Sequence, residues 1–223
     1  MAGGGSNTLP YTGRVPNSLA ELQQYNPNLP DAIEAIWQPY YDMQSYPTAG
    51  QTQLLFFQIP QGQSSKTLAD TNMVLAGQFP APTAFLTTAI MVLYMPGFAN
   101  SASNALAAAT PQANLNDVVK VADAGYLQLT IGSKVYLNDA PLGKFPPNFS
   151  IGGLQALAGT FTATAGVSAD FARSIGRYYE ITPLLIPMNQ NFSVSLNWPT
   201  AVAVTAIGRI AVILDGFYYR QSQ

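Results

Sequence analysis

The stretch NFSVSLNWP, residues 191–199, has the alternation that decides the fold class. Every second residue is apolar: Phe192, Val194, Leu196 and Trp198. Successive side chains of a β-strand point to opposite faces, so this pattern predicts a strand with one buried face. The other face would carry only Ser193, Ser195 and Asn197, without any charge. Such a face can lie against another subunit without the desolvation cost of buried charges.

Further strand patterns flank this stretch. The runs YLQLTI (126–131) and KVYLN (134–138) surround Gly132 and Ser133, which predicts a tight hairpin with a type II′-like turn. The run ITPLLIP (181–187) contains Pro183, so we expect an edge strand or a bulged strand there. Other strands are predicted at QLLFFQI (53–59), FLTTAIMVLY (85–94), TFTATA (160–165), AVAVTAI (201–207) and GRIAVILDGFYYRQ (208–221).

These runs predict an all-β protein. Roughly eight or nine strands with Pro/Gly-rich corners indicate an antiparallel β-sandwich. An immunoglobulin-type sandwich needs only about 100 residues, so a single jelly roll over residues 51–223 accounts better for the length. Short helical inserts are expected at 114–125, capped by Asn116 and ended by Gly125, and at 168–179, beginning at Ser168. Residues 99–114 read as a long surface loop.

Residues 1–50 differ from the rest, because they are rich in Gly, Pro, Asn, Gln and Tyr. Ser18 with Glu21, and Asp31 with Glu34, predict two short helix starts, the second ended by Pro39. A disordered leader is one interpretation. We favour an ordered N-terminal arm that packs on another surface, since disordered segments are usually poor in aromatic residues.

The composition is unusual in its charge. The chain has 223 residues, of which 9% are charged, against about 25% in typical soluble domains. It contains 12 Tyr and 11 Phe, and aromatic enrichment with charge depletion is typical of interface cores. We therefore expect neighbouring proteins to cover much of the surface. The subunit-interface residues predicted from the arm and from the stretch 191–199 are Trp37, Tyr40, Tyr41, Tyr46, Phe192 and Trp198.

The chain lacks residues on which several classes of enzyme and metal site depend. The chain has no Cys and no His, which removes thiol nucleophiles, imidazole bases and His-ligated metals. No secretory signal and no membrane-spanning helix are expected from the sequence. Lys and Arg never cluster, so we expect neither a basic genome-binding arm nor sequence-specific nucleic-acid binding.

The motif search yields weak signals. GQSSKT (62–67) resembles a phosphate-binding loop, but Pro60 and Ser65 occupy positions that require glycine. A Ser65–Lys66 nucleophilic pair lacks any oxyanion feature, and the two NFS acceptor patterns at Asn148 and Asn191 are attributed to chance. The scattered carboxylates single out no catalytic pair. We therefore predict no enzyme activity, no metal and no cofactor.

The chain resembles the jelly-roll major capsid proteins of tailless icosahedral viruses, including lipid-containing phages. The resemblance rests on the aromatic, Pro-rich arm (1–50), a strand-dominated body with long loops such as 99–114, and the closing strand RIAVILDGFYYR. It implies a virion shell built from copies of the chain, often as trimers with exchanged arms. It also implies contacts with other virion proteins or an internal membrane. The body is similar to one half of a double jelly roll, because its strands fit one roll.

An alternative function is a trimeric receptor-binding, tail-fibre or lectin-like module. This hypothesis predicts a ligand pocket in the loops, around residues 98–110 or 139–149.

Overall fold

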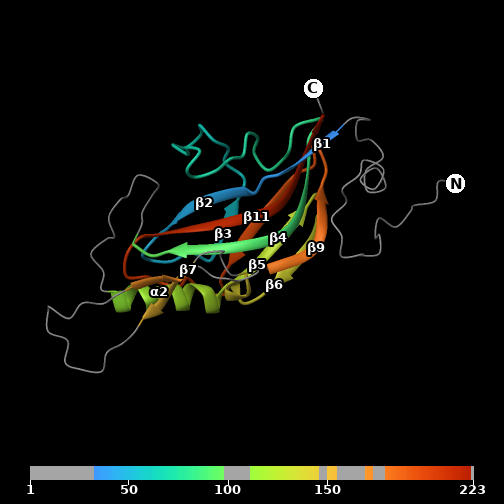
Figure 1. Cartoon of the computed structure of the whole chain (residues 1–223). Helices are drawn as coiled ribbons and strands as arrows, with labels where there is room; N and C mark the ends of the chain where they lie inside the picture. Colours follow the sequence, from blue (N-terminus) through green and yellow to red (C-terminus); the bar gives the residue numbers. More distant parts are fainter. Residues whose placement is uncertain (1–32, 98–110, 146–149, 155–168, 173–178, 222–223) are drawn as a thin grey trace, which may run out of the picture.

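The computed structural model describes residues 33–97, 111–145, 150–154, 169–172 and 179–221. Two antiparallel sheets face each other as a sandwich (Figure 1). The five-stranded sheet contains β1 (Ile33–Trp37), β2 (Tyr40–Tyr46), β4 (Ala84–Met95), β9 (Tyr179–Ile186) and β11 (Gly208–Gln221). The four-stranded sheet contains β3 (Gln53–Phe56), β5 (Tyr126–Ile131), β6 (Lys134–Asp139) and β10 (Phe192–Asn197). The smaller elements are α2 (Pro111–Ala124), the 3₁₀ turn η1 (Leu142–Lys144), and the strand pair β7 (Ser150–Leu154) and β8 (Ala169–Ala172).

The strands pair in a nested order. β2 pairs with β11, β3 with β10, β4 with β9, and β5 with β6, all antiparallel. Pairs alternate between the two sheets, which gives the orders β2-β11-β4-β9 and β3-β10-β5-β6. This is the jelly-roll arrangement, so the predicted all-β antiparallel sandwich is confirmed.

The core lies between the inner faces of the sheets. Phe192, Val194, Leu196 and Trp198 all point inward and are almost fully buried, as the alternation predicts. The Phe192 ring stacks on Phe79 with centroids 5.2 Å apart. Phe79 in turn contacts Tyr40 and Phe85 of the five-stranded sheet, with centroids 4.7 and 5.6 Å apart, so these aromatic contacts join the two sheets. Burying such side chains contributes about 2–3 kcal/mol each before entropy is counted.

The hairpin and the edge strand are confirmed. Gly132 takes φ +62° between β5 and β6, as the first central residue of a type II′ turn does. β9 is the end strand of its sheet, and its register with β4 shifts between Thr87 and Ala89. Pro183 lies inside β9. Proline has no backbone N–H, and in an edge strand this can be accommodated because one side of the strand has no partner in the sheet.

The predicted helix after Asp31 is wrong, because Ile33–Trp37 forms strand β1. It pairs with the C-terminal half of β11, from Ile33 opposite Gln221 to Trp37 opposite Phe217. β2 pairs with the first half of the same strand. Residues 33–46 therefore belong to the sandwich, and the sheet crosses the boundary that we predicted at residue 50. The Ser18 helix lies outside the described residues.

Four other expectations are corrected. Residues 201–207 form no strand, because the Thr205 N–H bonds to Asp117 Oδ2 at 2.7 Å and Val204 N–H bonds to Thr48 O at 2.9 Å. The helix expected from Ser168 is contradicted at Ala169–Ala172, which pairs with β7 as a strand. α2 exists and ends before Gly125, but it begins at Pro111, so Asn116 is not its cap. The loop expected at 99–114 is contradicted at 111–114, which form the first turn of α2. Its residues 99–110 and the strand expected at 160–165 lie outside the described residues.

Candidate functional site

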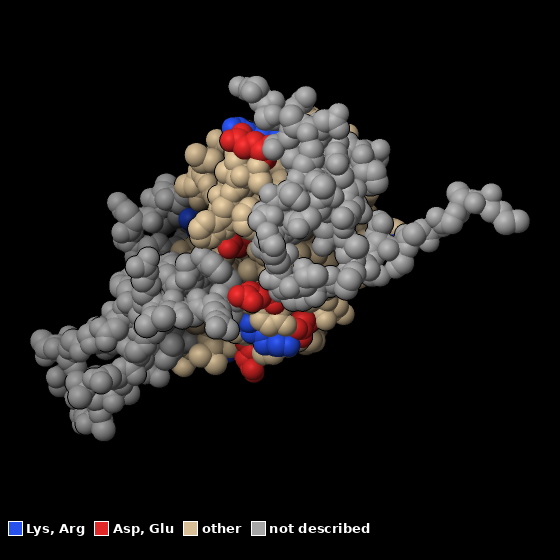
Figure 2. Space-filling model, turned by 45° about the vertical axis from the view of Figure 1, so that its right-hand side comes forward, with Lys and Arg blue, Asp and Glu red and all other residues tan. Residues whose placement is uncertain are grey.

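The outer face of the four-stranded sheet is free of charge. β3, β5 and β10 contain no Lys, Arg, Asp or Glu, and β6 carries charges only at its two ends. Register places Ser195 between Leu55 and Gln128, and Ser193 beside Thr130. Figure 2 shows the charged side chains of the described surface mostly in two small groups, in which acidic and basic side chains adjoin. The neutral face noted in residues 191–199 therefore extends across the strands of this sheet, but it is not all exposed, because Ser195 and Asn197 are only 5% and 7% exposed.

Two apolar patches border this face. We group as the β3-edge patch Leu55 of β3 and Val74 and Leu75 of the loop that follows, whose side chains are 48%, 73% and 37% exposed. Val74 and Leu75 follow β3 in a loop that folds back beside the strand end, because Gly77 N–H bonds to Phe57 O at 2.7 Å. The β6-edge patch consists of Val135 and Tyr136, which are 53% and 50% exposed. Because β3 and β6 are the two end strands, the patches lie on opposite edges of one sheet.

The edge of the five-stranded sheet at β2 is covered by a loop, and two β2 side chains, Gln44 and Asp42, bond to the backbone of β3 and its end. Residues 66–72 run along β2, with Met43 N–H bonded to Asp70 O at 2.8 Å and Asp42 bridged to Thr71. The Asn72 side chain accepts from Tyr41 N–H at 3.0 Å and donates to Pro39 O at 2.8 Å. Exposed edges invite association, so this loop blocks pairing of β2 with another chain.

Two ion pairs hold the covering loop. Lys66 Nζ bonds to Asp42 Oδ1 inside the molecule, and Arg209 bonds to Asp70 Oδ1 at 2.6 Å. Asp42 is fully buried, and burial raises the pKa of its carboxyl although Lys66 and the Phe57 N–H act in the opposite direction. Lys66 of the GQSSKT segment therefore pairs with Asp42, and its ammonium group does not point at an open phosphate site.

The predicted interface residues separate into two groups. Tyr40, Tyr46, Phe192 and Trp198 are at most 7% exposed, so their interface assignment is corrected: they build the core of the subunit. Their polar groups also bond within the subunit: the Tyr46 hydroxyl donates to Val202 O at 2.8 Å, and the Trp198 indole N–H donates to Val121 O at 3.1 Å. Alternation within their strands turns these four side chains inward.

Trp37 and Tyr41 remain interface candidates. Trp37 is 65% exposed while its Nε1 donates to Asp215 Oδ1 at 2.8 Å. Burial raises the pKa of the Asp215 carboxyl, and this hydrogen bond acts in the opposite direction. Tyr41 is half-buried, with its hydroxyl bonded to Leu68 O.

The edge patches were missed because burial depends on which strands end a sheet. One signal was available: Val135, Tyr136 and Leu137 are three consecutive apolar residues. Such a run breaks alternation where a bulge adds a residue. The register of β5 with β6 does shift there, between Leu129 and Thr130.

The described residues offer little for metal or catalytic chemistry. No three Asp or Glu residues gather in them as metal ligands, and none of their helices is long and apolar enough to cross a membrane. The pKa of Asp139 is lowered by its bonds to Lys144, Ala140 N–H and the Tyr179 hydroxyl. This cluster holds η1 beside β6 and is explained by that structural role.

The chain matches no protein-family model, no curated protein and no solved structure. The fold and the site define a jelly-roll β-sandwich with an uncharged sheet face between two apolar edges.

Proposed function

We propose that the chain is a self-assembling structural protein of a virion shell, without enzyme activity. One observation carries the proposal: the β3-edge patch and the β6-edge patch lie on opposite edges of a single sheet whose only charged residues are at the two ends of β6. Large exposed apolar side chains concentrated at sheet edges favour association with a partner. Copies of the chain are the partner that requires no further protein.

The arrangement favours a heterologous contact. The two patches differ in composition, so the β3 edge of one copy would meet the β6 edge of the next. Contacts of this head-to-tail kind close into rings when the rotation allows it. A trimeric ring is the unit that the capsid resemblance implies. The scarcity of charge then serves assembly, since buried interfaces are depleted in Lys, Glu and Asp.

The virion setting rests on the jelly roll together with the resemblance of the sequence to capsid proteins. In this setting other virion proteins or an internal membrane would cover the remaining neutral surface. Trp37 would contribute from the opposite sheet, because its ring is exposed while its indole N–H is already bonded to Asp215.

Substitutions of exposed valines test the assembly surface. Val74→Glu and Val135→Glu place a charge in the β3-edge patch and the β6-edge patch, whereas Val119→Glu makes the same change on α2, where the side chain is 57% exposed. We expect the wild-type chain and Val119→Glu to form large particles in electron micrographs and in sedimentation velocity. Both edge variants should remain folded, small species.

Normal particles from both edge variants would contradict the assembly surface. A wild-type chain that stays monomeric at high concentration would contradict the proposed function itself.

The alternative, a trimeric receptor-binding or lectin-like module, is favoured by a neutral polar pocket at one end of the uncharged face. It predicts stable trimers that never grow into larger particles.

A further inference from the structure

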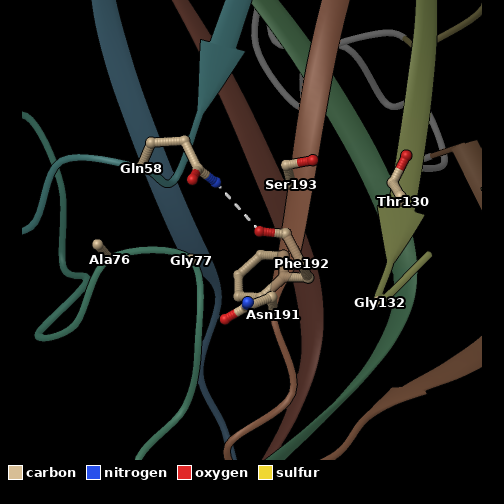
Figure 3. A pocket seen from close by; sticks show the side chains of 8 residues that line it. All are labelled: Gln58, Ala76, Gly77, Thr130, Gly132, Asn191, Phe192 and Ser193. Atoms are coloured by element: carbon tan, nitrogen blue, oxygen red, sulfur yellow. Dashed lines mark hydrogen bonds between the residues drawn. The ribbon is translucent and has the colours of Figure 1, made fainter.

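A cavity of about 300 Å³ opens at the end of the uncharged face where β10 begins and β5 ends. Its walls come from β5, β10 and the loops after β3, as Figure 3 shows. The described residues that line it are Gln58, Ala76, Gly77, Thr130, Gly132, Asn191, Phe192 and Ser193. None of them lies in residues 139–145, the described part of one loop where the sequence predicted a pocket, and the other loop, 98–110, lies outside the described residues.

The polar side chains that line the cavity are all neutral. They are the amides of Gln58 and Asn191 and the hydroxyls of Thr130 and Ser193. Register places Thr130 directly opposite Ser193 on neighbouring strands, so the two hydroxyls lie side by side. Amides and hydroxyls both donate and accept hydrogen bonds, and they give the cavity no preference for an ion.

The Gln58 amide is held in one orientation. Its Nε2 donates to Phe192 O at 3.1 Å and to Phe56 O at 3.3 Å, the first of which is drawn in Figure 3. Both donors point at backbone carbonyls, so Oε1 is the atom that can accept from a ligand. Gly77 lies directly beside this amide, because a Cβ built there would come within 3.0 Å of Nε2. Any larger residue at position 77 would displace Gln58.

We propose that this cavity binds a single uncharged sugar unit, either free or at the end of a glycan. A sugar hydroxyl both donates and accepts, which matches the fixed Oε1 of Gln58 and the paired hydroxyls of Thr130 and Ser193. Ala76 adds a small apolar contact for a ring carbon. A volume of about 300 Å³ is at the lower end for ligand pockets and suits one ring.

Absence of charge separates this ligand class from others. An anion or a cation that leaves water needs an opposite charge or several oriented partners, and the lining residues supply no charge. A neutral sugar has no ionic hydration to lose, and hydrogen bonds to the lining residues can replace those that its hydroxyls make with water. All the lining residues come from one subunit, but the cavity borders both edge patches, because Ala76 follows Leu75 and Thr130 pairs with Val135.

Saturation-transfer NMR on the full chain tests the proposal, and it works equally for monomers and large particles. The probes are glucose, galactose, mannose and N-acetylglucosamine, each free and as its methyl glycoside, with N-acetylneuraminic acid and glucosamine as charged comparisons. We expect saturation of at least one neutral sugar and of neither charged one. A response limited to the glycosides would identify the end of a glycan as the natural ligand.

Two variants locate the binding. Thr130→Val removes one hydroxyl from the cavity with almost no change of shape, and it should weaken binding about fivefold. Thr200→Val makes the same change at the other end of β10 and should leave binding unchanged. Ser193→Ala supplies a second cavity variant if Thr130→Val fails to fold.

Saturation of no neutral sugar would overturn the proposal. Equal affinity in the folded cavity variant and in Thr200→Val would also overturn it, because binding would then lie elsewhere.

Discussion

Lys66 Nζ donates a hydrogen bond to Asp42 Oδ1, and the carboxyl group of Asp42 has no exposed surface. The second oxygen of Asp42 accepts the Phe57 N–H at 2.6 Å. One buried carboxylate thus connects β2, the end of β3 and the loop that covers the β2 edge. Buried ion pairs add little net stability compared with apolar residues, but breaking one partner is costly.

Lys66→Met should destabilise the fold by about 3–5 kcal/mol, because it leaves Asp42 charged and buried without its partner. The double variant Asp42→Asn with Lys66→Met should recover most of this loss, since Asn still accepts from Phe57. Lys144→Met is the matched control: its pair with Asp139 is partly exposed, so its loss should have little effect on stability. Urea unfolding measures all three. A neutral Lys66→Met would contradict the connecting role of Asp42.

Asp215 should make stability fall as the pH rises. Its pKa is raised in the folded protein, mainly by burial, so the folded state holds this proton more tightly than the unfolded chain. The contribution is fully present below the unfolded pKa of about 3.9 and is lost as the pH passes the raised folded value. Asp215→Asn should therefore be more stable than the wild type at pH 7, with Trp37 still bonded to an oxygen.

The measurement for Asp215→Asn is urea unfolding at a series of pH values. Asp139→Asn is the control of opposite sign, because the pKa of Asp139 is lowered, chiefly by Lys144. Its stabilising contribution is present above the unfolded pKa and disappears as the pH falls through the folded value. Equal responses of the two variants would contradict this assignment.

Deletion of residues 1–50 should abolish folding, whereas deletion of residues 1–32 should leave both sheets intact. The longer deletion removes β1 and β2 together with the buried Tyr40, Asp42 and Tyr46. The shorter deletion ends where β1 begins. Circular dichroism and thermal unfolding distinguish the two. A folded product from the longer deletion would contradict the placement of β2 in the sheet.

Gly216 marks the bulge between the two halves of β11, and Gly216→Ala should cost more than about 4 kcal/mol. A Cβ at this position would lie 2.0 Å from Leu86 O, a backbone atom that cannot move aside alone. Gly62→Ala is the control, because nothing lies within 4 Å of its added Cβ. Only its φ of +85° would cost about 1–2 kcal/mol. Thermal unfolding of both variants gives the comparison.

The strand patterns predicted all four strands of the smaller sheet and β4, β9 and β11 of the larger one, because the apolar and polar residues that distinguish a strand are local in the sequence. They did not predict β2, since its residues were assigned to the N-terminal arm. They also failed at Ile33–Trp37, where Ala35 and Glu34 favour a helix locally. The partner that decides the structure there is β11, which is far away in the chain. The local sequence of residues 33–37 does not reveal that β11 will lie beside it as a pairing partner.

The candidate site was predictable only in part. The neutral face follows from Ser193, Ser195 and Asn197 alone. The edge patches and the cavity depend on which strands end a sheet and on where Gln58 meets Phe192, and both are products of the tertiary fold. Phe192 and Trp198 were assigned to an interface because aromatic side chains serve cores and interfaces equally well.

Opposite charges on the two patches should distinguish a head-to-tail contact from a symmetric one. Val74→Glu and Val135→Lys should each prevent assembly when present alone. The double variant should assemble again if the β3 edge of one copy meets the β6 edge of the next, because every contact then pairs Glu with Lys. In a symmetric contact the double variant would place like charges together and remain dispersed. Sedimentation velocity at low ionic strength measures the outcome, and high salt should weaken the restored assembly, since screening reduces the attraction between exposed charges.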